Sequence, residues 1–88
     1  MSDDYEPQAI KAFENLKVAL AAAGATAADI VSTKIYIVGY DQDKLAGLNV
    51  VRAELFALDT PPVSTLVGVE SLARPGLLIE VDAVAVIP

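Results

Sequence analysis

The sequence predicts a two-layer α+β domain in which two helices cover one face of a small mixed sheet. Two segments carry apolar residues at helical spacing, and three others are rich in β-branched residues or alternate apolar with polar ones. Their order along the chain is α-β-α-β-β. No linker or repeat divides the 88 residues, so residues 1–88 are expected to form a single domain.

Residues 5–23 are expected to form the first helix. Apolar residues at steps of three and four share one face: Ile10, Phe13, Leu16 and Leu20. Gly24 is a natural stop for this helix, and Thr26 is a candidate cap for a short turn that follows it.

Residues 31–38 read VSTKIYIV and predict the first strand. Side chains alternate between the two faces of a strand. One face is expected to carry Val31, Thr33, Ile35 and Ile37, and the other face Ser32, Lys34, Tyr36 and Val38. Tyr36 is expected to be an aromatic of the core or of an interface, although it could also close a pocket.

Asp41 is the expected cap of the second helix, which must end before Pro61-Pro62. Its apolar stripe is Leu45, Leu48, Val51 and Leu55. The charged side chains expected to face water are Lys44, Arg52 and Glu54.

The last two strands are expected at residues 63–69 and 77–87, joined as a hairpin through a turn at Pro75-Gly76. The second run places Glu80 and Asp82 on one face of an otherwise apolar strand. Because burying an unpaired carboxylate is costly, these acids must be exposed, paired or functional.

Composition excludes several classes of function. The chain has no His, Cys or Trp, which removes thiol nucleophiles, His-based acid–base chemistry and the usual zinc ligands. The net charge is −6, and the six basic residues are scattered, which disfavours a nucleic-acid partner. The start lacks the features of a signal peptide, and no apolar stretch is long enough to cross a bilayer. A cytoplasmic protein with no membrane partner is the default expectation.

The segment AFENLKVALAAAGATAADIVSTKIYI, a helix containing Leu48-Asn49, and the closing pieces PPVST and IEVDAVAV together resemble the Rid (YjgF) family of reactive-intermediate deaminases, also described as endoribonuclease L-PSP-like. The resemblance covers nearly all of residues 8–87. It implies a chorismate-mutase-like fold and a homotrimer whose intersubunit clefts bind small carboxylate-bearing molecules. It also implies hydrolysis of imines and enamines derived from amino acids, by an acid and a water, with no metal and no cofactor.

Three departures from the family pattern put that activity in doubt. The family's N-terminal strands have no counterpart, so the chain is expected to be truncated relative to the family. Val63 stands where the family's P-A-R-S-T strand entry carries an arginine that clamps the substrate carboxylate. The terminal-strand glutamate, thought to position the water, aligns with Asp82, whose carboxylate sits one methylene further back.

The resemblance makes Asp82 the candidate catalytic residue. The alternative interpretation is structural: Asp82 faces solvent or pairs with Lys34 across the sheet. Candidates for substrate binding are Asn49, Ser64, Thr65 and Arg74. Each also has a structural reading: Asn49 bonds local backbone, the hydroxyls pack in a strand, and Arg74 is a solvated charge near the hairpin turn.

Three hypotheses of function follow. The first is an imine or enamine deaminase with weak or absent activity. The second is a small-molecule-binding or regulatory oligomer that uses the same cleft without catalysis. The third is a truncated relic whose fold persists through subunit contacts. Fold by itself does not decide between them, because function lies in the site.

Overall fold

The computed structural model describes residues 4–55 and 62–87. The elements are α1 (Tyr5–Ala22), a 3-10 turn η1 (Ala27–Asp29), β1 (Ile30–Val38), α2 (Gln42–Leu55), β2 (Val63–Val69) and β3 (Ile79–Ala85). The α-β-α-β-β order is therefore confirmed, and most boundaries fall within two residues of those expected. The expected stop at Pro61 lies outside the described residues.

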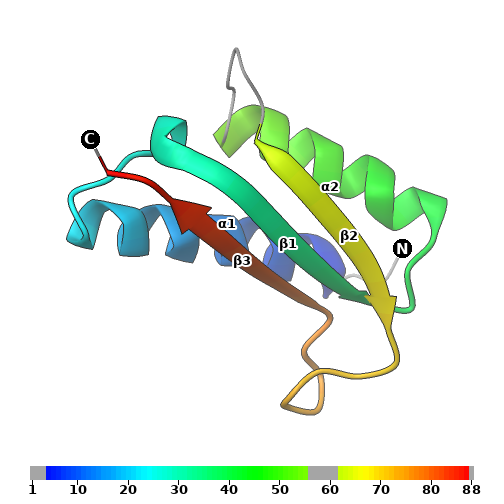
Figure 1. Ribbon diagram of the computed structural model, residues 1–88. Coiled ribbons are helices and arrows are strands. Elements are labelled where there is room, and N and C mark those ends of the chain that lie inside the picture. Colours follow the sequence, from blue (N-terminus) through cyan, green and yellow to red (C-terminus); the bar gives the residue numbers. More distant parts are fainter. Residues whose placement is uncertain (1–3, 56–61, 88) are drawn as a thin grey trace.

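The strands form one mixed sheet in the order β2-β1-β3, shown in Figure 1. β1 pairs in parallel with β2 and antiparallel with β3. The expected hairpin between β2 and β3 is therefore wrong, because β1 lies between them. A parallel β1–β2 pair needs a crossover connection, which α2 supplies, and the chain then passes to the opposite side of β1.

Both helices lie on the same face of the sheet (Figure 1). Their apolar faces pack against the central strand and β3 around a core of Tyr5, Ala9, Phe13, Ile35, Ile37, Leu48, Val51 and Ile79. The other face of the sheet carries no helix among the described residues (Figure 1). We call this second face the open face.

Local capping chemistry explains where several elements begin and end. The Lys44 amide donates to Asp41 Oδ1 at 2.8 Å, which confirms Asp41 as the cap of α2. The Thr26 amide donates to Asp29 Oδ2 at 2.9 Å at the start of η1. Gly24 has a φ of 79°, a left-handed conformation that favours glycine after a helix.

The alternation expected for β1 fails at its first residues. The pairing with β3 is irregular between Ile30 and Ser32, and this irregularity turns Val31 away from the core to 46% exposure. Ile30 is buried in its place. β3 is also shorter than the run 77–87 that predicted it, because its pairing with β1 covers only Ile79–Ala85. Within the described ranges, neither helix combines the length and apolarity of a membrane-spanning segment.

Candidate functional site

The open face presents side chains from all three strands. Alternate residues of a strand point to opposite faces, and Thr33, Ile35 and Ile37 are buried on the helix side of β1. The register then assigns the open face to Ser32, Lys34 and Tyr36 of β1, Val63, Thr65 and Val67 of β2, and Glu80, Asp82 and Val84 of β3. The expectation that Glu80 and Asp82 share a face is consistent with this register.

One row across the open face carries most of its polar groups. Lys34 of the central strand is paired with Thr65 on one side and with Asp82 on the other. All three residues are exposed. Directly opposed residues on antiparallel strands have Cβ atoms about 4.5–5.5 Å apart, so the side chains of Lys34 and Asp82 leave the sheet next to each other.

An open cavity of about 270 Å³ lies beside this row. It is lined by Ser32, Lys34, Asp82, Ala83 and Val84. Asp82, the candidate catalytic residue, therefore lies at a cavity that also contains a cation. Glu80 lies outside this cavity and is opposite Tyr36.

Asn49 and Ser64 lie apart from Asp82, on the helix side of the sheet. Ser64 pairs with Thr33, whose side chain is buried beneath the helices. Arg52 joins the two residues: its Nη2 donates to Asn49 Oδ1 at 2.7 Å and its Nη1 donates to Ser64 Oγ at 3.3 Å. We call these three residues the Arg52 cluster.

The Arg52 cluster shows that the expectation for Arg52 is wrong, and it separates Asn49 and Ser64 from the other predicted site residues. Arg52 was expected simply to face water, but it is half-buried and bridges α2 to the start of β2. Lys44 departs from the same expectation, because its Nζ donates to the carbonyls of Val38 at 3.1 Å and Gly39 at 2.6 Å. Of the four predicted substrate-binding residues, only Thr65 shares a face with Asp82.

Arg74 is exposed on the connection between β2 and β3. It borders a different cavity, of about 480 Å³, which is lined by residues 70–78 and Val38. This cavity shares no lining residue with the one at Asp82. Within one chain, Arg74 and Asp82 therefore do not form a common site.

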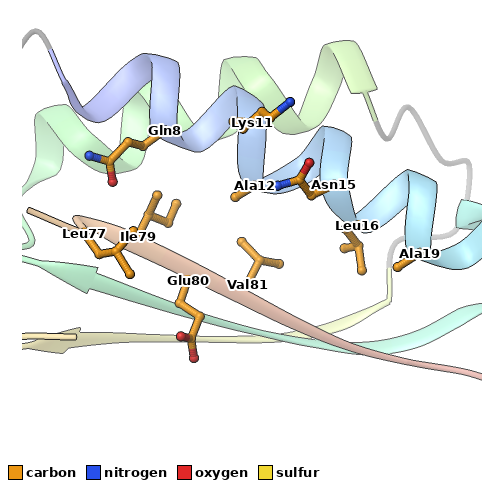
Figure 2. Close-up of a pocket in the computed structure, with 10 residues that line it drawn as sticks. All are labelled: Gln8, Lys11, Ala12, Asn15, Leu16, Ala19, Leu77, Ile79, Glu80 and Val81. Carbon is orange, nitrogen blue, oxygen red and sulfur yellow. The ribbon is translucent and has the colours of Figure 1, made fainter. Parts of the chain in front are cut away.

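A groove of about 440 Å³ runs between α1 and β3 (Figure 2). Ile79, Val81 and Leu16 supply apolar walls, and Figure 2 shows the Glu80 side chain directed away from α1. Gln8 fixes one end, because its Nε2 donates to the Gly76 carbonyl at 2.9 Å and its Oε1 accepts from the Leu78 amide at 2.8 Å. β3 is an edge strand of the sheet that the described residues form.

The chemistry at the open face is that of a carboxylate and a cation. Among residues 4–55 and 62–87, no group of three or more acidic, His or Cys side chains could hold a metal ion. Asp82 is able to orient or deprotonate a water, and Lys34 is able to bind an anion. The sequence analysis considered Lys34 only as an ion-pair partner of Asp82. The alternation of residues along β1 gives the face on which Lys34 lies, but it does not identify the groups around the side chain.

Comparison with known proteins gives consistent results. A family model described as Endoribonuclease L-PSP matches residues 1–87. A RutC family protein of Pyrococcus horikoshii is 33% identical over 82 residues, which are 93% of this chain and 62% of that protein. The chain thus spans less than two thirds of the length of this curated relative.

Solved structures show the same likeness. A Mycobacterium tuberculosis member of the YjgF/YER057c/UK114 family has a TM-score of 0.83 and 37% identity, over 99% of this chain and 71% of that one. RidA from an Antarctic Psychrobacter bacterium has a TM-score of 0.79 and 28% identity, over 90% of this chain and 61% of that one. The mixed sheet with two helices on one face is therefore similar to the architecture of these proteins.

Proposed function

The chain belongs to the Rid/YjgF family, described as Endoribonuclease L-PSP, and from this membership we propose that it hydrolyses imines or enamines derived from amino acids, with reduced activity. The observation that carries the proposal is the position of Asp82. Its carboxylate is exposed in the middle of β3, at a cavity on the open face and opposite a lysine. The position matches the acid that the family resemblance assigns to the catalytic strand.

The proposed reaction adds water to a carbon–nitrogen double bond. Asp82 orients the water and accepts its proton as the oxygen attacks the imine carbon. That proton passes to the nitrogen and gives a carbinolamine. Asp82 then carries the hydroxyl proton to the nitrogen as well, the carbon–nitrogen bond breaks, and ammonia leaves as the carbonyl of the 2-oxo acid forms. No His or Cys is present in the sequence to replace the carboxylate in this role.

We further propose that the site is completed by assembly. Large apolar side chains remain exposed on or beside the open face, including Val63 at 72%, Val84 at 58% and Val31 at 46%. Contiguous apolar surface of this kind is typical of an interface. A homo-oligomer, most simply a trimer, would cover it and turn the open cavity at Asp82 into a cleft between subunits.

The second candidate function is binding without turnover in the same cleft. Val63 favours it, because valine cannot make the bidentate contact with a carboxylate that an arginine makes. Cleavage of RNA gains less support, because the net charge is −6 and Lys34 is the one basic residue that the register places on the open face. A measurement of imine hydrolysis decides between the deaminase and binding without turnover.

The test compares two carboxylates on the same face of the same strand. Hydrolysis of 2-aminoacrylate-type imines is measured for the unmodified protein, Asp82→Asn and Glu80→Gln. Asp82→Asn is expected to abolish turnover with fold and oligomer mass unchanged, whereas Glu80→Gln has a smaller effect. Full activity in Asp82→Asn, or loss of the oligomer, would show that Asp82 is structural. Ligand binding without turnover in the unmodified protein would favour the second candidate.

A further inference from the structure

The six basic residues, all of which the structure describes, occupy very different places. Lys11 and Lys17 lie on α1, on the other side of the sheet, and Arg74 lies on the β2–β3 connection. Both Lys44 and Arg52 are engaged in hydrogen bonds that join neighbouring elements. Lys34 alone stands on the open face, in the central strand and at the Asp82 cavity.

We propose that Lys34 binds the carboxylate of the substrate, in place of the arginine that Val63 does not supply; this inference rests on the proposed function. Val63 pairs with Ser32, so Lys34 lies one pleat further along the same face of the neighbouring strand. Adjacent strands lie about 4.8 Å apart, and successive residues on one face are separated by about 7 Å. A lysine stem with four methylenes crosses such a distance easily and places its ammonium in the region that an arginine at position 63 would reach.

The pairing of Lys34 with Asp82 also selects a class of ligand. The two side chains are direct cross-strand neighbours, so the groups they recognise must be close together. A carboxylate bonded to the reacting carbon meets this condition: the ammonium holds the carboxylate while the Asp82 carboxylate reaches the water at the next carbon. This arrangement fits a 2-imino acid, the substrate class of the proposed function.

Lys34 is available for this role in the free protein. Both Lys34 and Asp82 are exposed, and an exposed pair of opposite charges is weak because water screens it. The ammonium can therefore exchange solvent water for a substrate carboxylate. Lysine offers a point charge rather than a planar fork, so it binds the carboxylate but orients it less strictly than arginine. This difference accounts for a reduced rather than absent activity.

The experiment measures both turnover and binding. Steady-state kinetics on a 2-imino acid and NMR titration with pyruvate are carried out for the unmodified protein, Lys34→Met, Lys34→Arg and Lys17→Met. Lys34→Met keeps the length of the side chain and removes its charge. It should raise KM for the imine and Kd for pyruvate about tenfold or more, the effect of one charged contact, and leave kcat within about threefold.

The remaining variants separate binding from structure. Lys34→Arg should restore both constants, and Lys17→Met, an exposed lysine on α1, should leave them unchanged. Asp82→Asn should lose turnover but keep or strengthen pyruvate binding, because it removes a negative charge beside the bound carboxylate. Weaker binding in Lys34→Met, together with lost turnover but retained binding in Asp82→Asn, is not expected if the two residues only align the strands.

The outcomes distinguish this inference from the proposed function. If the protein hydrolyses the imine and Lys34→Met leaves KM and Kd unchanged, Lys34 is not the carboxylate site, and the proposed function stands. If Lys34→Met instead lowers kcat together with stability or oligomer mass, the residue is structural and the inference is wrong. If the unmodified protein neither turns over the imine nor binds pyruvate, the proposed function fails and the inference fails with it.

Discussion

Arg52 donates a hydrogen bond of 2.7 Å to Asn49, one turn earlier on α2. The Oδ1 atom of Asn49 is thereby engaged, and the same guanidinium reaches Ser64 at the start of β2. The Arg52 cluster thus connects a helix to an edge strand, on the side of the sheet away from Asp82. We expect it to stabilise the fold rather than to bind substrate.

Replacing Arg52 by Met tests this role. The variant retains an apolar stem but loses both hydrogen bonds, and the free energy of unfolding should fall by about 1 kcal/mol. Urea denaturation measures the change, and pyruvate binding should be unaffected. Arg74→Met is the control, because Arg74 is exposed and its loss should cost less than about 0.5 kcal/mol. Loss of turnover at unchanged stability, in Arg52→Met or Asn49→Ala, would instead assign the cluster to the site.

Restoring an arginine at position 63 should raise the activity. Val63 lies on the open face with 72% of its side chain exposed, so the longer side chain has room. The arginine adds a planar bidentate contact, at an exposed position, to the point charge that Lys34 supplies. Val63→Arg should therefore increase kcat/KM on a 2-imino acid by about tenfold, equivalent to about 1.4 kcal/mol.

The control for position 63 is Val67→Arg, which adds the same charge to the same face of β2 and should have little effect. The argument from Val63 would be wrong if the unmodified chain already matched an ordinary family member. It would also be wrong if both arginine variants gained equally, since the gain would then come from charge alone.

Tyr5 is expected to make the folded protein less stable as the pH rises into the alkaline range. Its side chain is fully buried, and its hydroxyl donates to the Lys44 carbonyl at 3.0 Å. Burial, and then the nearby Asp41 carboxylate, raise the pKa of the Tyr5 hydroxyl above 10.0. The folded protein thus holds this proton more tightly than the unfolded chain, so its contribution is fully present below about pH 10 and is lost as the pH rises through the folded-state pKa.

Tyr5→Phe should show the effect directly. At neutral pH the variant loses one hydrogen bond and about 1 kcal/mol of stability. Above about pH 10 the loss of stability with pH should be shallower in Tyr5→Phe than in the unmodified protein, because the buried hydroxyl no longer titrates. Tyr40→Phe, at a residue 36% exposed, is the control. Identical pH profiles for Tyr5→Phe and the unmodified protein would contradict the assignment to Tyr5.

The open face should be an interface between copies of the chain. Light scattering at micromolar concentration is expected to give the mass of a homo-oligomer, with a trimer first and a dimer second. Val84→Lys, on the open face, should lower the mass by placing a charge in the interface. Val50→Lys is the matched control, because Val50 on α2 has 57% exposure against 58% for Val84. A monomer mass for the unmodified protein would refute the assembly.

The sequence by itself was enough for features that depend on near neighbours in the chain. Helical periodicity predicted α1 and α2, and β-branched runs predicted the three strands. The Asp41 cap was predictable because it satisfies an amide only three residues away. The shared face of Glu80 and Asp82 follows from the period of a strand, whatever the strand pairs with.

Only the tertiary structure decided which distant residues meet. The linear order predicted a hairpin of β2 and β3, but β1 separates them, because strand order is set by how the whole sheet packs under its helices. That order places Lys34 opposite Asp82, one of the two alternatives that the sequence interpretation left open, and brings Ser64 to Arg52, which that interpretation did not anticipate. No local pattern decides such contacts, because cross-strand register depends on packing between segments separated by tens of residues.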